Sequence, residues 1–490
     1  MTTNNIEWLY NDLQKWIKNG CNECVGKQVI KLDISDNQLK VIPKEIGKLT
    51  QLKEFDCVKN YITKIPKEIS NLTQLKIFNC SINCMTKIPK EIFNLTQLEE
   101  LHCRDNKITK IPKEIGNLTH LKKFDCGTFC QMQLVELGMS PMDNHDINQI
   151  AKIPKEIKNL TQLTYFDCGG NVIQKIPKEI GNLIQLNKFI CNYNQIKKIP
   201  IEIGKLTQLQ YLELSYNQIK EIPKEIGNLI QLESFNFDHN QVKKIPKEMC
   251  KLSQLQEMFF SENQIKEIPK EIEEMKQLET IECVRNKIKE IPKEMGNLIN
   301  LTRFHCSGNK IKKIPIEIMN CRRMEIFCYD NNEIDYIQPQ IARWLDELEN
   351  GQEIYADTQS VHNHAIQEGV TKSINYITSI KPSIQIKQLN KLIINNQYLT
   401  ERTKRLLFEY IDDKEIHSIL HITFEELLLS VYDFIEKNEN KEELFKIMNE
   451  EMTESNCKCF TGRISRLINV LNGYDENIKI HIADNEQSHF

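Results

Sequence analysis

The sequence has few of the features that lead a chain into or across a membrane. Its first residues, MTTNNIEWLYNDLQKW, contain no basic start followed by an apolar run, so they do not resemble a secretory signal. No stretch reaches the roughly 18–20 uncharged apolar residues that a membrane-spanning helix needs. We therefore expect a cytoplasmic protein that does not insert into a membrane.

An excess of charge of one sign is also lacking. The 64 lysines and arginines nearly balance the 68 aspartates and glutamates, for a net charge of -4. Such a chain has no general attraction to nucleic acid or to anionic membranes. Lysines recur in rows, but glutamates such as Glu45, Glu68 and Glu91 run beside them, which is typical of a solvated face. We predict no nucleic-acid partner.

Motifs for catalysis and for metal binding are absent or incomplete. The sequence contains no G-x-S-x-G, no H-E-x-x-H, no phosphate-binding G-x-x-x-x-G-K-[ST] loop and no set of kinase motifs. Cys21 and Cys24 form a C-x-x-C pair, but a zinc site needs two further ligands and none lies nearby in the sequence. We predict that the protein is not an enzyme and that it holds no metal and no cofactor.

What the sequence does contain is an internal repeat. Ile-Pro pairs recur every 23 residues, with one longer step of 42 residues between Pro112 and Pro154. One unit, LKEFDCVKNYI at residues 52–62, matches the pattern L-x-x-L-x-L-x-x-N-x-L. Phe55 and Cys57 alternate in this unit, so both point to the same side of a short strand. Each unit is therefore expected to form one coil of a solenoid.

A column of asparagines marks the coils. Each amide can hydrogen-bond backbone groups of its own and of a neighbouring coil, which cannot reach water there. The column consists of Asn37, Asn60, Asn83, Asn106, Asn148, Asn171, Asn194, Asn217, Asn240, Asn263, Asn286, Asn309 and Asn332. These 13 positions leave no gap once an insertion over residues 129–147 is allowed for. With strands ~4.8 Å apart, they predict a parallel concave sheet about 60 Å long. The insertion is interpreted either as a functional loop or as a tolerated one.

Cysteines fill one inward position of the repeat. The eight equivalent residues are Cys57, Cys80, Cys103, Cys126, Cys168, Cys191, Cys283 and Cys306. Cysteine is often buried as a small hydrophobic residue, so this column belongs to the core. A secreted protein would risk scrambled disulfides along such a column, so we infer a reducing compartment.

The repeat also sets the expected domain boundaries. Residues 1–29 carry an amphipathic stripe that begins at Ile6, and we predict an N-terminal capping helix there. The array spans residues 30–339 in about 13 coils, and residues 340–350 form a C-terminal cap. From 351 to 490 the period is lost, and apolar stripes at helical spacing predict a mainly helical C-terminal domain.

The repeat resembles a known family. The segments IPKEISNLTQL at Ile65, IPKEIGNLTHL at Ile111 and IPKEIGNLIQL at Ile176 look like the Ras-group class of intracellular leucine-rich-repeat proteins. The resemblance covers residues 30–339 and implies a cytoplasmic horseshoe that binds proteins through its concave face, although it carries over no partner. The segment CKCFTGRISRLINVLNGY at 457–474 resembles tails of giant-DNA-virus proteins, which implies the host cytoplasm. The predicted fold is an α/β solenoid, a leucine-rich-repeat horseshoe with a parallel concave sheet, followed by an α-helical C-terminal domain.

Outward positions of the strands and their turns supply the candidate binding residues. They are Asp56, His102, Asp125, Tyr165, Asp167, Ile190, Tyr193, Tyr211, Glu213, Tyr216, Asn236, Phe259, Glu282 and His305. Tyrosine anchors are typical of binding hot spots, and concave acids favour a basic or mixed partner surface. The alternative interpretation is that exposed strand positions are simply polar.

These patterns predict a non-enzymatic scaffold or adaptor that binds a protein partner through the concave face, in intracellular signalling. Two alternatives stay open. One is an effector similar to an E3 ubiquitin ligase that uses a tail cysteine, although Cys457 and Cys459 do not stand in that family's Cys-x-Asp pattern. The other is a structural component of a virion.

Overall fold

The computed structural model describes four stretches of the chain, residues 6–128, 147–349, 374–412 and 422–454. By its internal contacts the chain divides into two compact units. The first comprises Met1–Ile311 and Asn320–Glu333, and the second comprises Lys312–Met319 and Ile334–Phe490. The insertion predicted at 129–147 lies, except for its last residue, outside the described residues, as do the tail cysteines.

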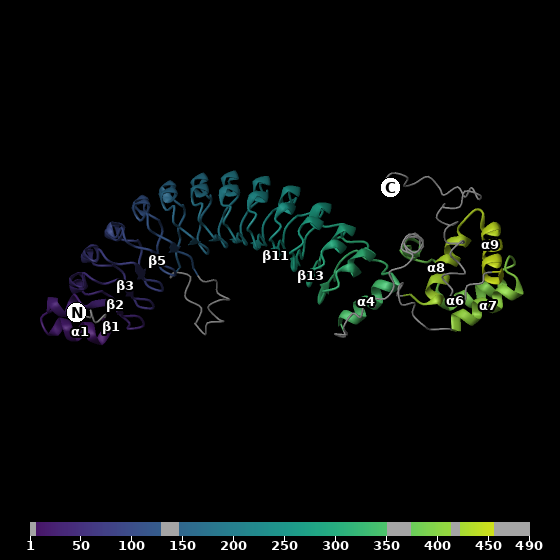
Figure 1. Cartoon of the computed structure of the whole chain (residues 1–490), viewed down its shortest axis with the longest axis horizontal. Helices are drawn as coiled ribbons and strands as arrows, with labels where there is room; N and C mark the ends of the chain where they lie inside the picture. Colours follow the sequence, from purple (N-terminus) through teal and green to yellow (C-terminus); the bar gives the residue numbers. More distant parts are fainter. Residues whose placement is uncertain (1–5, 129–146, 350–373, 413–421, 455–490) are drawn as a thin grey trace. The chain divides into compact units, whose positions relative to one another are not determined.

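The first unit is built on one parallel sheet of 14 strands in sequence order. The strands are β1 Ile6–Leu9, β2 Val29–Asp33, β3 Glu54–Asp56, β4 Ile77–Asn79, β5 Glu100–His102, β6 Lys123–Asp125, β7 Tyr165–Asp167, β8 Lys188–Ile190, β9 Tyr211–Glu213, β10 Ser234–Asn236, β11 Glu257–Phe259, β12 Thr280–Glu282, β13 Arg303–His305 and β14 Ile326–Cys328. Within this unit the strands line the inner side of an arc (Figure 1). The predicted solenoid with a parallel concave sheet is therefore confirmed.

The outer side of the arc consists of short 3-10 turns (Figure 1). They are η1 Lys44–Lys48, η2 Lys67–Asn71, η3 Lys90–Asn94, η4 Lys113–Asn117, η5 Lys155–Asn159, η6 Lys178–Asn182, η7 Ile201–Lys205, η8 Lys224–Asn228, η9 Lys247–Lys251, η10 Lys270–Glu274 and η11 Lys293–Asn297. The turn η12, Ile316–Asn320, belongs to the second unit except for its last residue. Most begin directly after a proline whose φ is near -65°, such as Pro177 with φ -69°. Proline suits this position because it has no N–H to contribute to a sheet ladder.

The core lies between the sheet and the turns. The middle residue of each three-residue strand is buried, as Phe124, Phe166 and Phe189 show with no exposed surface. The rings of Phe124 and Phe166 stack at 5.6 Å between centroids. Burying a side chain of this size stabilises the fold by about 1.5–3 kcal/mol. Because the repeat buries such a side chain in each coil, every coil contributes to the stability of the array.

The asparagine column ties each coil to the one before it. Asn194 is typical, because its Oδ1 accepts the N–H of Ile173 at 2.9 Å and its Nδ2 donates to the carbonyl of Cys168 at 3.0 Å. Every ladder asparagine from Asn60 onward has both kinds of bond, whereas Asn37 in the first coil donates only to Ser35.

The ladder continues across the insertion. The Oδ1 of Asn148 accepts the N–H of Ile108, and its Nδ2 donates to Cys103 at 3.0 Å. Strand β6 pairs directly with β7, with Asp125 opposite Asp167. The register of the array is therefore the same on both sides of the insertion.

The N-terminal end differs from the helix predicted over residues 1–29. Its first described residues form the strand β1, and the helix α1 runs only over Tyr10–Lys18, followed by α2 at Glu23–Gly26. Strand β1 pairs with β2, and Trp8 packs against Trp16 with ring centroids 5.5 Å apart. An unpaired first strand would expose a row of backbone hydrogen-bonding groups, and β1 covers that edge.

The second unit contains mostly α-helices. They include α4 Pro339–Glu349, α6 Ile386–Asn395, α7 Glu401–Asp412, α8 Phe424–Glu436 and α9 Lys441–Glu454. The buried Tyr432 of α8 belongs to the hydrophobic core of this unit, and its hydroxyl accepts from Asn396 at 2.7 Å and donates to the carbonyl of Leu392 at 3.1 Å. The predicted helical C-terminal region is confirmed. In the parts of the chain that the structure describes, no helix is long and apolar enough to cross a membrane.

Helix α4 makes its described side-chain contacts inside the second unit. Gln340 Nε2 donates to Thr378 Oγ1 at 3.1 Å, and Arg343 forms an ion pair with Glu426. Its predicted role as the cap of the last coil stays a prediction.

Candidate protein-binding surface

The concave face of the sheet is the surface that sequence analysis selected. In each strand the middle side chain enters the core, so the first and last residues face outward. Lys188 and Ile190 are partly exposed on either side of the buried Phe189. The face therefore presents two outward residues per coil, followed by the residues of the turn that ends the strand.

The structure aligns most of the predicted residues in one row. Ten of them are the last residues of β3 and β5–β13, namely Asp56, His102, Asp125, Asp167, Ile190, Glu213, Asn236, Phe259, Glu282 and His305. The register pairs neighbours in this row directly, for instance Ile190 with Glu213 and Phe259 with Glu282. Tyr165 and Tyr211 begin their strands, and Tyr193 and Tyr216 lie in the turns.

Several acids of this row have a structural role that sequence analysis missed. The Oδ1 of Asp56 accepts the backbone N–H of Val58 at 2.9 Å, and Asp167 accepts that of Gly169 at the same distance. Glu213 accepts the N–H of Ser215 at 3.0 Å. A carboxylate or amide at the end of the strand thus fixes the turn two residues later. The recurrence of Asp or Asn as the last residue of several strands was the available signal.

Two predicted residues, Asp125 and Asp167, are buried in an ion-pair cluster. Arg104 donates from Nε to Asp125 Oδ2 at 3.0 Å and from its Nη2 to Asp167 Oδ2. Tyr165 donates its hydroxyl to the same Asp167 oxygen at 3.3 Å. Burial, together with the charge of Asp125, raises the pKa of Asp167 to about 6. These two acids are therefore largely occupied within the protein, and Arg104 was not among the predicted residues.

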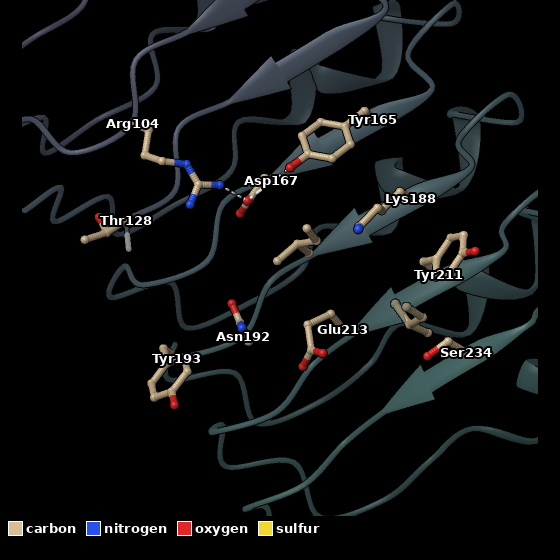
Figure 2. Close-up of a pocket in the computed structure, with 12 residues that line it drawn as sticks. Arg104, Thr128, Tyr165, Asp167, Lys188, Asn192, Tyr193, Tyr211, Glu213 and Ser234 are labelled. Carbon is tan, nitrogen blue, oxygen red and sulfur yellow. Dashed lines mark hydrogen bonds and ion pairs between the residues drawn. The ribbon is translucent and has the colours of Figure 1, made fainter. Parts of the chain in front are cut away.

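A depression of about 420 Å³ lies beside this cluster. Tyr165, Lys188 and Tyr211 line the side where the strands begin, and Thr128, Asn192 and Tyr193 line the opposite side (Figure 2). Asp167 and Glu213 lie between these two rows, and Ile190 also lines the depression. A Cβ at position 169 would lie 2.2 Å from Asn192 Oδ1, so a larger residue there would displace the Asn192 side chain that lines the depression. The ammonium of Lys188 lies 5.3 Å from the ring centroid of Tyr211, at cation–π distance.

Stacked rings follow the strand ends in three successive coils. Tyr193 and Tyr216 are 4.2 Å apart between ring centroids, and Tyr216 and His239 are 4.0 Å apart. We call these three residues the aromatic ridge. All three have positive φ, between 48° and 52°, in the turn that precedes the ladder asparagine. Sequence analysis found the two tyrosines but missed His239.

Acids without a basic partner gather on the next coils. Of the described residues, no lysine or arginine forms an ion pair with Glu213, Asp238 or Glu282. Burial, reinforced by Glu282, Glu213 and Glu262, raises the pKa of Asp238 to about 7. Asp238 follows strand β10 by two residues and was also missed by the sequence analysis.

No metal site is evident on the parts of the chain that the structure describes, where no group of three or more His, Cys, Asp or Glu side chains is placed to hold an ion. The 14 described cysteines are all free thiols. Cys168 and Cys191, in adjacent coils, lie 3.3 Å apart between sulfurs and are fully buried. Burial raises the pKa of the Cys57, Cys80 and Cys103 thiols well above the usual range, which makes them poor nucleophiles.

Comparison with known families and structures identifies the repeat. A family profile described as a leucine-rich repeat region matches residues 29–136 and 191–287. The array is a leucine-rich-repeat fold. Comparison with curated proteins found no match.

Several solved structures share this leucine-rich-repeat fold. An internalin (inlF) from Listeria monocytogenes is 23% identical with a TM-score of 0.55, over 64% of this chain and 84% of the internalin. The plant peptide hormone receptor RGFR1, solved in complex with RGF2, is 27% identical with a TM-score of 0.52, over 63% of this chain and 53% of the receptor. A TDR receptor is 25% identical with a TM-score of 0.51, over 64% of this chain and 57% of that one. The matched region thus spans little more than half of each receptor chain.

Proposed function

We propose that this protein is a non-enzymatic scaffold that binds a protein partner through the concave face of its leucine-rich-repeat array. The observation that carries the proposal is the aromatic ridge together with Tyr211 and Phe259. Tyr193, Tyr211 and Tyr216 are 36%, 39% and 41% exposed, although their coils are stabilised by a separate core. Exposed aromatic side chains on a rigid face are typical binding anchors. The similarity to the plant peptide hormone receptor RGFR1, solved in complex with RGF2, supports a protein-binding role for the array.

The finer parts of the proposal rest on other observations. The column of free, buried thiols supports a reducing compartment such as the cytoplasm, and the host cytoplasm if the chain is viral. The resemblance to the Ras-group class supports a role in intracellular signalling. The helical second unit, with its own buried core, is long enough to bind a further protein and so make the chain an adaptor. We expect the partner of the concave face to have a basic or mixed surface.

The test compares the partners of the parent chain with those of an aromatic variant, Tyr193→Ala, Tyr211→Ala, Tyr216→Ala and Phe259→Ala. Affinity purification of the tagged full chain with mass spectrometry should recover specific partners from the parent and lose them from this variant. Circular dichroism checks that the array still folds, because all four side chains lie on its surface or in its turns.

A matched control carries four substitutions of exposed isoleucines outside the strands. These are Ile184→Ala, Ile201→Ala, Ile230→Ala and Ile299→Ala, at residues that are 52%, 56%, 52% and 61% exposed. We expect the control to keep every partner. An aromatic variant that kept the parent's partners, while folding normally, would show that recognition takes place elsewhere on the chain.

A further inference from the structure

Charge is compensated in one part of the concave face and not in another. Between β5 and β7, Asp125 and Asp167 are both paired with Arg104, and Glu100 pairs with Lys123 at 2.9 Å. Between β9 and β12 the pattern changes. Glu213, Asp238 and Glu282 form no ion pair with any described lysine or arginine. We call these three residues the acidic triad.

Within the acidic triad, Glu213 and Glu282 lie close enough to Asp238 to disfavour its negative charge. Glu282 and Glu213 act on Asp238 from β12 and β9, on either side of its coil, and Glu262 acts from the turn after β11. Together with burial they raise the pKa of Asp238 to about 7, and burial raises the pKa of Glu213. Basic groups near the triad include Lys188, whose charge favours ionised Glu213, His305, which lies opposite Glu282 in the register, and His239, which follows Asp238. Arg285 is held by Glu262 at 2.7 Å. A cation placed among these carboxylates would relieve a repulsion that the protein itself leaves in place.

Aromatic groups stand around the same carboxylates. Phe259 faces outward from β11, directly beside Glu282 in the register, and Asn236 lies between Phe259 and Glu213. The aromatic ridge continues through His239, the residue after Asp238. Glu213 also borders the depression of about 420 Å³, which gives a long side chain room beside it. A side chain with a charged end group and an apolar stem can place its charge near these carboxylates and pack its stem against the aromatic rings.

We propose that the acidic triad is the docking site for an arginine or lysine side chain of an extended basic segment in the protein partner. The cation lies among Glu213, Asp238 and Glu282, and the stem of the side chain packs between Phe259 and the aromatic ridge. This inference rests on the proposed function, because it assigns the chemistry of the partner at the same face. Charge complementarity favours a basic segment, since Asp238 and Glu282 form no ion pair with a described lysine or arginine and Arg285 is already paired with Glu262.

Docking of a cation displaces a proton. Asp238, with a pKa near 7, is mostly protonated at pH 6 and mostly ionised at pH 8. A bound cation favours the ionised form, so affinity rises as the pH rises through 7. If the pKa falls well below 6 in the complex, binding is about tenfold tighter at pH 8 than at pH 6. Arginine keeps its own charge across this range, so the change reports on the protein.

The experiment uses three fluorescein-labelled dodecapeptides in which Arg, Gln or Glu alternates with Ser. Their binding to the full chain is measured by fluorescence anisotropy in 150 mM NaCl at pH 6 and at pH 8. The test variant is Glu213→Gln, Asp238→Asn and Glu282→Gln, which keeps the side-chain oxygens that accept the N–H groups of Ser215 and Ser261. The control, Asp33→Asn, Asp36→Asn and Glu54→Gln, makes the same change of charge at the first coils of the array.

We expect the Arg peptide to bind the parent at least tenfold more tightly than the Gln and Glu peptides. The triad variant should lose this preference, and the control should keep it within twofold. Asp238→Asn alone should abolish the difference between pH 6 and pH 8, which tests the idea even if the triple variant folds poorly.

Equal binding of the Arg peptide to the parent and to the triad variant overturns the inference, as does a lack of preference for Arg in the parent. The proposed function is judged separately by the partners of the aromatic variant. If the aromatic variant loses partners that the triad variant keeps, the scaffold function stands and the docking chemistry is wrong. If neither variant loses a partner, the proposed function itself fails.

Discussion

The rings of Tyr216 and His239 lie parallel, with 4.0 Å between their centroids, although the two residues belong to different coils. Both occupy the same position of the repeat, in a turn with φ of 52° and 50°. Neighbouring coils are ~4.8 Å apart, so flat side chains at one repeat position stack face to face. The ridge therefore arises from the periodicity itself, wherever aromatic residues fall on this position.

The ridge should contribute to stability as well as to binding. Tyr216→Ala removes both stacking contacts of the central ring, and we expect a loss of about 1 kcal/mol in the free energy of unfolding. Tyr61→Ala, at a 56% exposed tyrosine, is the control and should change stability by less than about 0.5 kcal/mol. Urea unfolding monitored by circular dichroism measures both. Equal effects would mean that the stacked rings add nothing beyond exposed surface.

The asparagine ladder should be far less tolerant of substitution than the asparagines of the outer turns. Asn194→Ala leaves the buried N–H of Ile173 without its partner, at about 1–3 kcal/mol, whereas the carbonyl of Cys168 keeps its bond from Asn171. Asn182→Ala, at an exposed position of η6, should be nearly neutral. Thermal unfolding compares the two variants, and amide hydrogen exchange at Ile173 should rise only in Asn194→Ala.

Removing Arg104 should be costly, because it leaves the buried Asp167 without its cation and Asp125 with only His102 as a basic partner. We expect Arg104→Ala to lose about 3–5 kcal/mol at neutral pH. Arg285→Ala breaks an ion pair whose arginine side chain is 72% exposed, and it should lose less than about 1 kcal/mol. The defect of Arg104→Ala should shrink at pH 5, since Asp167, with a pKa of about 6 in the parent, becomes protonated there. A defect of the same size at both pH values would argue against a charge origin.

Removing the charge of Asp238 should raise the stability of the fold, whereas removing that of Arg104 should lower it. Its pKa is about 7 in the folded chain and ordinarily 3.8, so the fold disfavours the ionised form. This destabilisation is absent below pH 4, grows as the pH rises to 7 and is constant above that. Asp238→Asn should therefore raise stability by about 1–2 kcal/mol at pH 8, after allowance for solvent screening, and by little at pH 4. Melting temperatures of the parent and the variant from pH 4 to pH 8 would reveal a gap that widens with pH, and a constant gap would contradict the assignment.

The succession of strands and turns in the array could be predicted from sequence because each coil repeats the same pattern of residues. Asn60 and its equivalents mark the turns, and the alternation of Phe55 and Cys57 marks the inward side of each strand. Strand β1 could not be predicted in this way. Ile6 and Leu9 fit the helical spacing of the stripe that follows, and what makes them a strand is the open edge of β2, which lies 20 residues or more along the chain.

The binding surface was predicted less completely, for reasons of geometry. Period-two alternation locates outward residues inside a strand, and it found Glu213 and Phe259. It does not apply beyond the strand, so Asp238 and His239, which lies in a turn with positive φ, were missed. Nor does it distinguish an acid that is free to bind from one like Asp167, whose partner Arg104 lies 63 residues earlier.

The direct pairing of β6 with β7 makes the position after Thr128 suitable for inserting further chain. The N–H of Thr128 bonds to the carbonyl of Gly169 at 3.0 Å, and Asn148 resumes the ladder, so the coils are in register whatever length of chain joins them. Loop length adds only slowly to the cost of closing such a connection. The array is in this sense modular. A reporter domain or a second recognition element can be inserted between residues 128 and 148 without changing the register of the coils on either side.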